Sequence, residues 1–541
     1  MESERPNVLW IAMEDTSPRF GCYGDQLART PNIDRLASES RLYENAFVTA
    51  GVCAPSRASI MTGMYPQEVC AQHMRTSTQD RKGLVESYEA VPPHYVTAVS
   101  EYLRDDGYYC TLNQKSDYQF GEPFTMWDEH GDDAHWRNRT DDEQPFFAMF
   151  TNGVTHESGM WPPEMDRWGG SDGPLETDPQ DVDVPPYLPD TDRTRRAIAR
   201  HYDNIAASDE WVGALLDELE SSGVAEDTIV VLWSDHGEGL PRAKRWPYDS
   251  GTNVPLIVRI PGETEGETVD ELVSLVDLGP TTLSLCGQDV PQYMSGQPFL
   301  GPDATDREYV FATRDRYDEE YDMVRSVRDD RYRYVRHYYP ERPYVQWIPY
   351  RNAHPAMQEL LRLDAEDALD SVQRQWLSDS RPVEELYDTC EDPHEVRNLA
   401  GDPAYRDVLE RLRGELDDWR QRTNDRAHGD EAEREMRDRV WPEGDQPTAA
   451  TPNFVPNAPD NRGRELAPNG GTFEGPMTVS LYCPTQGASI AYATDTGSDP
   501  HWKLYSGPLR FEEGQEVTLR TKAVRYGYEE SDERTATFKI S

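Results

Sequence analysis

Lysine is the residue that this sequence most clearly lacks. Only six of its 54 basic residues are lysines, whereas acidic residues number 101, so the formal net charge is -47. A field of that sign repels nucleic acid and anionic membranes, and neither is expected as a partner. An acid-rich, lysine-poor surface is typical of a halophilic protein, because salt screens its self-repulsion; an arginine-rich coding background is the alternative. Against this background, Lys115 and Lys244 are candidates for chemistry rather than for surface charge.

Paired cysteines, long apolar runs and an N-terminal export signal are also missing. The seven cysteines are scattered without a C-x-x-C spacing, which argues against a disulfide framework or a zinc cage. No apolar run approaches the length that spans a bilayer, and the first residues carry neither a basic region nor an apolar core. We therefore expect a soluble, cytoplasmic protein with no membrane span. A secreted protein whose signal has been removed is the alternative.

Short continuous apolar runs predict the fold class. Residues 7–13, 146–151 and 228–233 are almost wholly apolar, which is typical of strands buried on both faces of a parallel sheet. A long amphipathic helix is predicted over residues 192–222, and a strand and helix at 272–285 are expected to close the sheet. This alternation predicts an α/β domain with helices flanking a large, mainly parallel sheet.

The pattern of the sequence changes after residue 305. Residues 323–335 alternate in polarity around Asp329 and Asp330, as an antiparallel hairpin does. A charged and then proline-rich stretch follows, and the end of the chain alternates short strands with turns. We predict four parts, namely the α/β domain at 1–305, an antiparallel α+β subdomain at 306–426, a semi-rigid linker at 427–470 and a β-sandwich module at 471–541.

Polar residues follow four of the predicted strands. They are Glu14 and Asp15 after the first strand, Lys115 after the strand at 108–112, His156 after residues 146–151, and Asp235 and His236 after residues 228–233. Ligands of open α/β sheets collect at the carboxyl ends of the strands, so paired acids there are well placed for a cation. Taken alone, the first acidic pair is better explained as a loop with a helix cap, and a lone histidine after a strand is more often a loop residue.

The stretch around Cys53 carries the most specific signal. Pro55 suits a first helical turn and Gly63 can end the helix, so Cys53 is expected at a helix N-terminus. Free N–H groups and the helix dipole there favour a thiolate or a bound oxyanion. The alternative is a buried cysteine that acts as a small hydrophobic side chain.

Residues 53–57, Cys-Ala-Pro-Ser-Arg, continuing into Thr62-Gly63, resemble the C-x-P-S-R core of type I sulfatases. The strand-end residues listed above match further motifs of that family in its order. The resemblance implies an alkaline phosphatase-like α/β fold with a small antiparallel subdomain. The end of the chain, around Tyr492-Ala493-Thr494-Asp495, resembles the C-terminal β-sandwich of chitobiase and β-hexosaminidase. We favour a structural or docking role for that module over a dedicated sugar-binding site.

The resemblance also implies the chemistry. A maturation enzyme, the formylglycine-generating enzyme, would oxidise Cys53 to formylglycine, whose hydrate attacks sulfur, and elimination from the covalent sulfo-enzyme would restore the aldehyde. Arg57 would steady the hydrate, Lys115 and Lys244 would complement the sulfate charge, and His156 or Lys244 would protonate the leaving group. A divalent cation, most often Ca²⁺ in this family, would be held by Glu14, Asp15, Asp235 and His236, together with the group derived from Cys53.

Two positions depart from the family pattern. Glu14 stands where an aspartate is usual, and Asp117 stands where many members have a histidine, which puts leaving-group protonation from that position in doubt. His73 and Arg75 could line the pocket, although a surface position is favoured for that histidine. The excursion at residues 159–190 is expected to shape the substrate cleft.

The motifs look closest to the heparan N-sulfatase-like branch and predict a hydrolase that releases sulfate from an O- or N-sulfated substrate, a sulfated saccharide in particular. A phosphodiesterase or phosphonate monoester hydrolase on the same scaffold is the enzymatic alternative. A catalytically inactive glycan-binding protein is the alternative of another class. The sugar, the position of its sulfate, endo or exo action and the oligomeric state are left open.

Overall fold

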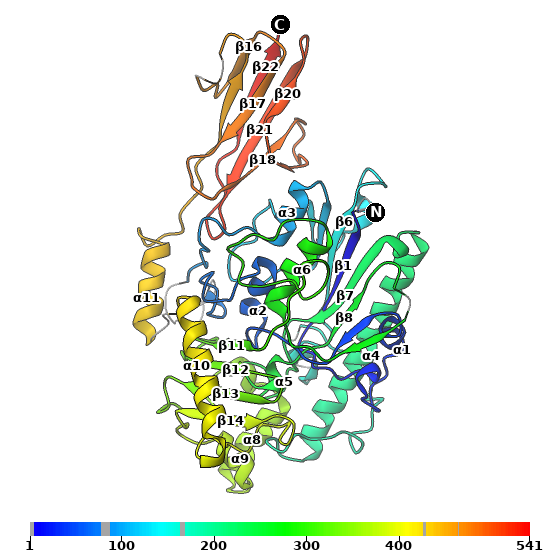
Figure 1. Ribbon diagram of the computed structural model, residues 1–541, viewed down its shortest axis with the longest axis vertical. Coiled ribbons are helices and arrows are strands. Elements are labelled where there is room, and N and C mark those ends of the chain that lie inside the picture. Colours follow the sequence, from blue (N-terminus) through cyan, green and yellow to red (C-terminus); the bar gives the residue numbers. More distant parts are fainter. Residues whose placement is uncertain are drawn as a thin grey trace.

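The computed structural model describes residues 5–76, 87–162, 168–171, 173–263, 265–425, 429–461, 463 and 465–541. A mixed eight-stranded sheet forms the centre of the main body (Figure 1). Its strands are, in spatial order, β5 (Glu129–His130), β4 (Tyr109–Asn113), β6 (Phe146–Asn152), β1 (Asn7–Met13), β7 (Thr228–Ser234), β8 (Leu256–Arg259), β2 (Arg41–Tyr43) and β9 (Glu267–Val269). The first five run parallel, so their carboxyl ends lie along one edge of the sheet.

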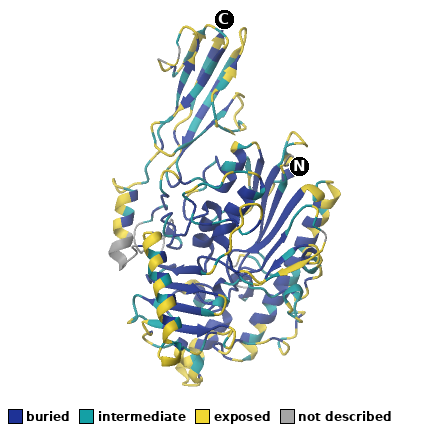
Figure 2. Cartoon of the chain, in the orientation of Figure 1, coloured by how far each residue is buried: buried dark blue, intermediate teal, exposed yellow. Residues whose placement is uncertain are grey.

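Helices cover both faces of this sheet. Because side chains of a strand alternate between faces, Leu9 and Ile11 of β1 pack in one apolar cluster and Val8 and Trp10 in another. The first cluster contains side chains of α1 (Pro31–Ala37) and α4 (Asp192–Ser221), and the second those of α2 (Cys53–Thr62), α3 (Val99–Asp105) and α6 (Leu278–Leu285). The continuous apolar runs of the sequence follow from this burial on two sides (Figure 2).

A second, antiparallel sheet lies beside the main one. Its order is β11 (Val310–Arg314), β12 (Val324–Arg328), β13 (Tyr332–His337) and β14 (Glu384–Asp388), and the register of β12 against β13 confirms the hairpin. One face packs on α10 (Arg406–Arg422) through a cluster that includes Leu412, Leu416 and Trp419. The other face packs toward α4 and α8 (Pro355–Ala365). The remaining helices near it are α5 (Asp249–Thr252), α7 (Pro349–Asn352) and α9 (Ser371–Trp376).

One expected strand lies elsewhere. Residues 272–285 were expected to contribute a strand that closes the main sheet, but β10 (Val273–Ser274) pairs with β3 (Ala46–Phe47) in a separate two-stranded sheet. The chain turns at once into the 3-10 helix Leu275–Asp277, so β10 is too short to extend the sheet. The edge position is taken by β9, which pairs with β2.

The C-terminal strands form two sheets that pack on each other. One has the order β15 (Asn453–Asn457), β17 (Met477–Tyr482) and β20 (Leu509–Phe511), and the other β16 (Gly470–Phe473), β22 (Arg534–Ile540), β21 (Glu516–Val524), β18 (Ser489–Ala493) and β19 (Lys503–Leu504). The expected linker is therefore not a simple one, because it contains α11 (Gly429–Val440) and β15, which pairs with β17. Pairing compensates for the proline of β15, as this strand lies at a sheet edge.

The module is docked on the main body through Tyr526. This side chain is buried within the main-sheet cluster, where its hydroxyl accepts a hydrogen bond from Ala98 N at 3.0 Å and contacts the carboxylate of Glu101. Its ring stacks on Phe120 at 5.3 Å between centroids. Within the described ranges, none of the helices has the length and apolar character needed to cross a membrane.

Candidate active site

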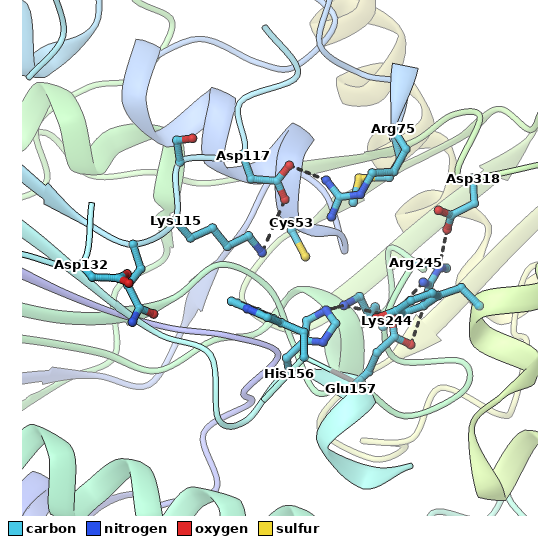
Figure 3. A pocket seen from close by; sticks show the side chains of 15 residues that line it. Cys53, Arg75, Lys115, Asp117, Asp132, His156, Glu157, Lys244, Arg245 and Asp318 are labelled. Atoms are coloured by element: carbon cyan, nitrogen blue, oxygen red, sulfur yellow. Dashed lines mark hydrogen bonds and ion pairs between the residues drawn. The ribbon is translucent and has the colours of Figure 1, made fainter. Parts of the chain in front are cut away.

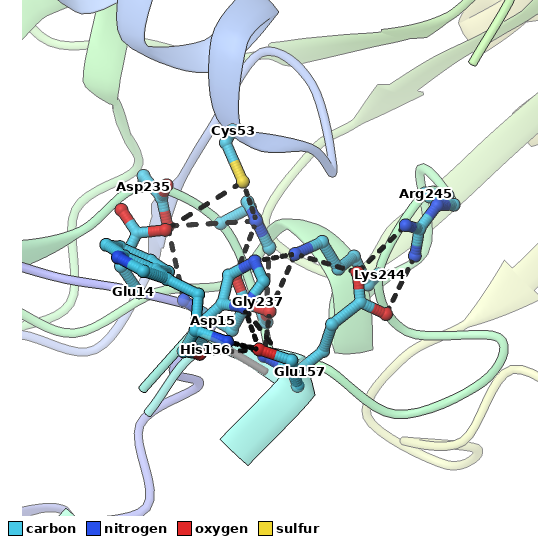
Figure 4. Close-up of polar contacts among 12 residues, drawn as sticks. Glu14, Asp15, Cys53, His156, Glu157, Asp235, Gly237, Lys244 and Arg245 are labelled. Carbon is cyan, nitrogen blue, oxygen red and sulfur yellow. Dashed lines mark hydrogen bonds and ion pairs between the residues drawn. The ribbon is translucent and has the colours of Figure 1, made fainter. Parts of the chain in front are cut away.

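The ends of β1, β7, β6 and β4 bring the predicted site residues together at one edge of the sheet (Figure 4). Asp15 adopts a left-handed backbone conformation with a φ of 48°, which is strained for a residue with a side chain. Neighbouring strands hold it there, because its N–H donates to Asp235 Oδ1 at 3.2 Å and its carboxylate accepts from Glu157 N at 2.7 Å. The turn after β1 is thus fixed by β7 and by the loop after β6.

Cys53 is the first residue of α2 and lies at the floor of a cavity of about 810 Å³ (Figure 3). Its Sγ is 3.3 Å from His236 Nε2 and 3.9 Å from Glu14 Oε2. The preceding loop packs tightly on the loop that carries Lys244, since a side chain at Gly51 would meet the Trp246 carbonyl oxygen at 2.6 Å. This close approach sets the position of Cys53 relative to the lysine.

Two groups of metal-binding atoms surround this thiol. Ligand atoms of Glu14, Asp15, Cys53 and His156 lie within 4.8 Å of one another, and so do those of Cys53, Asp235 and His236. All of these side chains are buried. Three carboxylates and an imidazole offer the oxygen-rich set that hard divalent cations prefer. The residues present therefore fit a divalent cation.

Buried cations neutralise the three carboxylates. Arg57 Nε donates to Asp235 Oδ2 at 3.1 Å, and its Nη2 contacts Glu14. Lys115 Nζ lies 2.5 Å from Glu14 Oε2, and Lys244 Nζ lies 2.7 Å from Asp15 Oδ2. Burial alone would raise the pKa of Asp15, but the charges of Lys244 and His236 lower it well below its usual value.

The pair formed by Lys244 and His156 holds its proton on the lysine. Burial lowers the pKa of His156 to about 4, and the charge of Lys244, whose Nζ is 3.5 Å from His156 Nε2, adds to this effect. Burial opposes the charged form of Lys244 as well, but Asp15 and nearby anionic groups raise its pKa well above the usual value. At neutral pH the lysine is the proton donor of this pair, and the histidine is neutral.

Asp117 does not act as the missing histidine would. Its carboxylate contacts Arg75 and lies 3.5 Å from Lys115 Nζ. Burial would raise the pKa of Asp117, but the charges of Arg75 and Lys115 lower it, so the group is ionised and has no proton to give. Instead, it holds both cations on one wall of the cavity (Figure 3).

The prediction of a surface position for His73 is wrong. The side chain is 1% exposed, and its Nδ1 accepts a hydrogen bond from Arg316 N at 3.3 Å. The segment packs against the loop that follows β11, and this turns Arg75 into the cavity. No local pattern in the sequence indicates such a long-range contact.

Several cavity residues escaped the sequence analysis. Glu157 accepts two hydrogen bonds from Arg245, at 2.8 and 3.0 Å, and lies 3.1 Å from Lys244 Nζ. Both follow a predicted site residue directly, and this adjacency could have identified them. Trp168 and Tyr350 line the cavity on either side of His156, with ring centroids 4.9 and 6.2 Å from the imidazole. The tryptophan comes from the excursion at 159–190, of which residues 163–167 and 172 lie outside the described ranges.

Comparison with known proteins places this site in a family. The family model described as "Sulfatase" matches residues 6–288, which is more than half of the chain and includes every predicted site residue. The chain belongs to the sulfatase family. Two further models match this sulfatase, "N-sulphoglucosamine sulphohydrolase, C-terminal" at residues 237–375 and "Chitobiase/beta-hexosaminidase C-terminal domain" at residues 468–536.

Relatives by sequence are sulfatases too. An "Ulvan-active sulfatase" of Formosa agariphila is 42% identical over 563 residues, covering 98% of this chain and 90% of the relative. The human "N-sulphoglucosamine sulphohydrolase" is 28% identical over 466 residues, covering 77% and 90%. Among solved structures, a "2-O GAG sulfatase" aligns with a TM-score of 0.54 at 23% identity, covering 78% of this chain and 93% of that chain. A phosphonate monoester hydrolase from Silicibacter pomeroyi aligns as well, with a TM-score of 0.55 at 19% identity and coverages of 77% and 96%. These likenesses confirm the α/β fold, but fold alone does not separate sulfate from phosphorus esters.

Proposed function

We propose that this sulfatase releases sulfate from a sulfated saccharide, with Cys53 in its formylglycine form as the nucleophile. The observation that carries the proposal is the position of the Cys53 thiol, on the floor of a cavity and between buried acids and buried cations. A maturation enzyme must convert Cys53, since the change from thiol to aldehyde is an oxidation. Once formed, the aldehyde hydrate supplies an oxygen nucleophile that a thiol cannot.

The residues around Cys53 support a Ca²⁺ site. Glu14, Asp15 and Asp235 would supply carboxylate oxygens and His236 its imidazole nitrogen, since these groups converge on the thiol position. Calcium accepts many oxygen ligands in flexible geometry, which suits three carboxylates. A bound divalent cation polarises a sulfate oxygen and lowers the pKa of a coordinated hydroxyl. Because His236 Nδ1 lies 2.8 Å from Gly237 O, its Nε2 faces Cys53 and the acids.

The cationic side chains suit an anionic ester. Lys115 and Lys244 approach from opposite sides of the cavity and would complement the charge that develops on the sulfuryl oxygens (Figure 3). Arg57, fixed by Glu14 and Asp235, would act by orienting these acids, since both of its contacts are to them. Lys244 carries the proton that the departing oxygen or nitrogen needs, and His156 accepts its hydrogen bond and keeps it aimed.

A saccharide substrate is favoured by the mouth of the cavity and by the relatives. Trp168 is 42% exposed and Tyr350 is 38% exposed, although both line the cavity. Aromatic rings of this kind offer an apolar face to the C–H side of a sugar, while their polar edges meet water. The names of the relatives in sequence refer to ulvan and to N-sulphoglucosamine, both sulfated saccharides. We infer an O- or N-sulfated sugar, and place the phosphorus-ester and binding-only alternatives below it.

A panel of substrates tests this proposal. Wild-type protein, co-expressed with a formylglycine-generating enzyme and supplied with Ca²⁺ at high salt, is incubated with ulvan oligosaccharides, N-sulphoglucosamine, an aryl sulfate and an aryl phosphodiester. We expect sulfate release from at least one sulfated sugar, and kcat/KM for the aryl sulfate above that for the phosphodiester. A preference for the phosphodiester would overturn the assignment, and so would a complete lack of turnover by protein whose Cys53 is fully converted.

A further inference from the structure

A second cavity, of about 780 Å³, lies where three parts of the molecule meet. The segment after α2 contributes Gln72, α10 and the residues after it contribute Arg422, α11 contributes Arg439, and the C-terminal module contributes Arg525 and Tyr528. We call it the junction cavity. The module thus has a role in shaping a cavity, beyond being attached to the main body (Figure 1).

Its three arginines have no acidic partner in the described part of the chain. Arg422 and Arg439 are exposed, and the only contact given for the latter is with Cys70 Sγ at 3.4 Å. Arg525 stacks over the Tyr528 ring and donates to its hydroxyl at 3.2 Å, while its Nε is buried without a hydrogen-bond partner. In a protein with a net charge of -47, three unpaired arginines around one cavity point to an anionic ligand.

The rest of the lining suits a polar chain with flat faces. Tyr95 is 49% exposed and stands beside Pro92 and Pro93. Two acids also line the cavity: Glu68 is bound to Tyr65 N and Ser295 Oγ, and Glu435 forms no ion pair with the arginines. Guanidinium groups bind sulfate and carboxylate in a forked geometry, and tyrosine rings pack on sugar faces.

The two cavities share one stretch of chain. Gln72 and His73 line the junction cavity, whereas Met74 and Arg75, the next two residues, line the catalytic one. A polysaccharide that places one sulfated sugar over Cys53 therefore has a second anion-binding cavity close by. A monosaccharide or an aryl sulfate is too small to reach both.

We propose that the junction cavity is a second binding site for the sulfated polysaccharide, in which Arg422, Arg439 and Arg525 hold anionic groups of the chain remote from the one being cleaved. This inference rests on the proposed function for the chemistry of its ligand. It assigns the C-terminal module a share in substrate binding, through Arg525 and Tyr528.

Full-length charge-reversal variants test the second site. The junction variant is R422E/R439E/R525E, and a matched control, R193E/R397E/R406E, reverses three exposed arginines that line neither cavity. Native gels that contain heparin, with dextran as the uncharged comparison, report binding. We expect the junction variant to bind heparin at least about tenfold more weakly than wild type, and the control to stay within about twofold. The neutral variant R422Q/R439Q/R525Q repeats the test should the reversed one fold poorly.

Aryl sulfate turnover, measured on the same proteins, separates this inference from the proposed function. Equal turnover by wild type and junction variant, together with weaker heparin binding by the variant, supports the second site. Unchanged heparin binding by the junction variant overturns the second site and leaves the sulfatase assignment intact. Weaker binding by the junction variant, in a protein that hydrolyses no sulfate ester, overturns the proposed function and leaves the second site standing.

Discussion

The two cavities of this sulfatase treat positive charge in opposite ways. In the catalytic cavity, Lys115, Lys244 and Arg245 each lie between 2.5 and 2.8 Å from a carboxylate oxygen. In the junction cavity, Arg422 and Arg525 have no such partner within the described residues. Paired cations are fixed in position, and fixed cations stabilise charge that develops during a reaction without having to reorganise. Unpaired cations stay free to follow an anionic chain.

The comparison also assigns different consequences to the loss of a charge. Removing a cation from the catalytic cavity leaves a buried acid uncompensated, so the position of its neighbours changes as well. Removing an arginine from the junction cavity leaves no acid behind, and only the ligand loses a contact. The predictions below use this difference, in order of decreasing effect.

Loss of Cys53 should have the largest effect. Cys53→Ala removes the group that becomes the nucleophile, and kcat for an aryl sulfate should fall on the order of 1,000-fold or more. Cys286→Ala is the control, because this buried cysteine lies in the main apolar cluster away from the cavity. Comparable activity of the two variants in a sulfate-release assay would contradict a covalent role for Cys53.

Lys244→Met should lower kcat by about 100-fold to 1,000-fold. The change removes the proton donor next to His156 and the positive charge beside Asp15 and Glu157. The matched change in the junction cavity, Arg439→Met, should leave aryl sulfate turnover within about twofold, because its charge has no acidic partner. The contrast is lost if steady-state kinetics show the two substitutions to be equally harmful, with both proteins folded by circular dichroism.

The aromatic mouth should matter for sugars and not for small esters. Trp168→Ala or Tyr350→Ala should raise KM for a sulfated oligosaccharide by about threefold to tenfold, with kcat nearly constant. Trp347→Ala provides the control, since this side chain is 60% exposed and does not line the cavity. An equal rise of KM for the aryl sulfate would show that the rings support the catalytic groups rather than the sugar.

Stability should fall as the pH drops from about 6.5 toward 4, in part through His354. Burial lowers the pKa of this histidine to about 4, so the unfolded chain takes up its proton first and is favoured on acidification. Each such group contributes up to about 1.4 kcal/mol per pH unit in that window. His354→Asn keeps an acceptor for Ala356 N and should lose less stability between pH 7 and pH 5 in urea titrations. An unchanged pH dependence would exclude His354 as a source.

Salt should give the smallest change. If the acidic surface is an adaptation to a saline medium, the free energy of unfolding should rise between 0.1 and 2 M KCl, because salt screens the net charge of -47. Aryl sulfate turnover should change less than heparin binding, because the catalytic ion pairs are buried and those of the junction cavity form with solvent-exposed arginines. A constant or falling unfolding free energy would argue against the halophilic interpretation.

Local sequence patterns were enough to predict much of the fold and the core of the site. The strands that carry Asp15, His156 and Asp235 are apolar on both faces, and a ligand-binding residue at a strand end needs no long-range information to be recognised. The helix that begins at Cys53 and ends at Gly63 follows from the same kind of reading.

What the sequence did not reveal depends on tertiary contacts. Tyr350 reaches the cavity from α7, and nothing near it in sequence indicates the site. His73 becomes buried only because the loop after β11 covers it. The strand β15 lies in a stretch whose prolines predicted a linker, and its partner β17 alone makes it a strand. The junction cavity combines residues from parts that were interpreted separately.

The mass of the peptide that spans Cys53, taken from protein made in its native host, tests the central claim most directly. Conversion to formylglycine removes one sulfur and two hydrogens from this residue and adds one oxygen. We predict that this peptide carries that change and that the converted fraction scales with sulfate-releasing activity across preparations. Full activity in protein whose Cys53 remains an unmodified thiol would contradict the account.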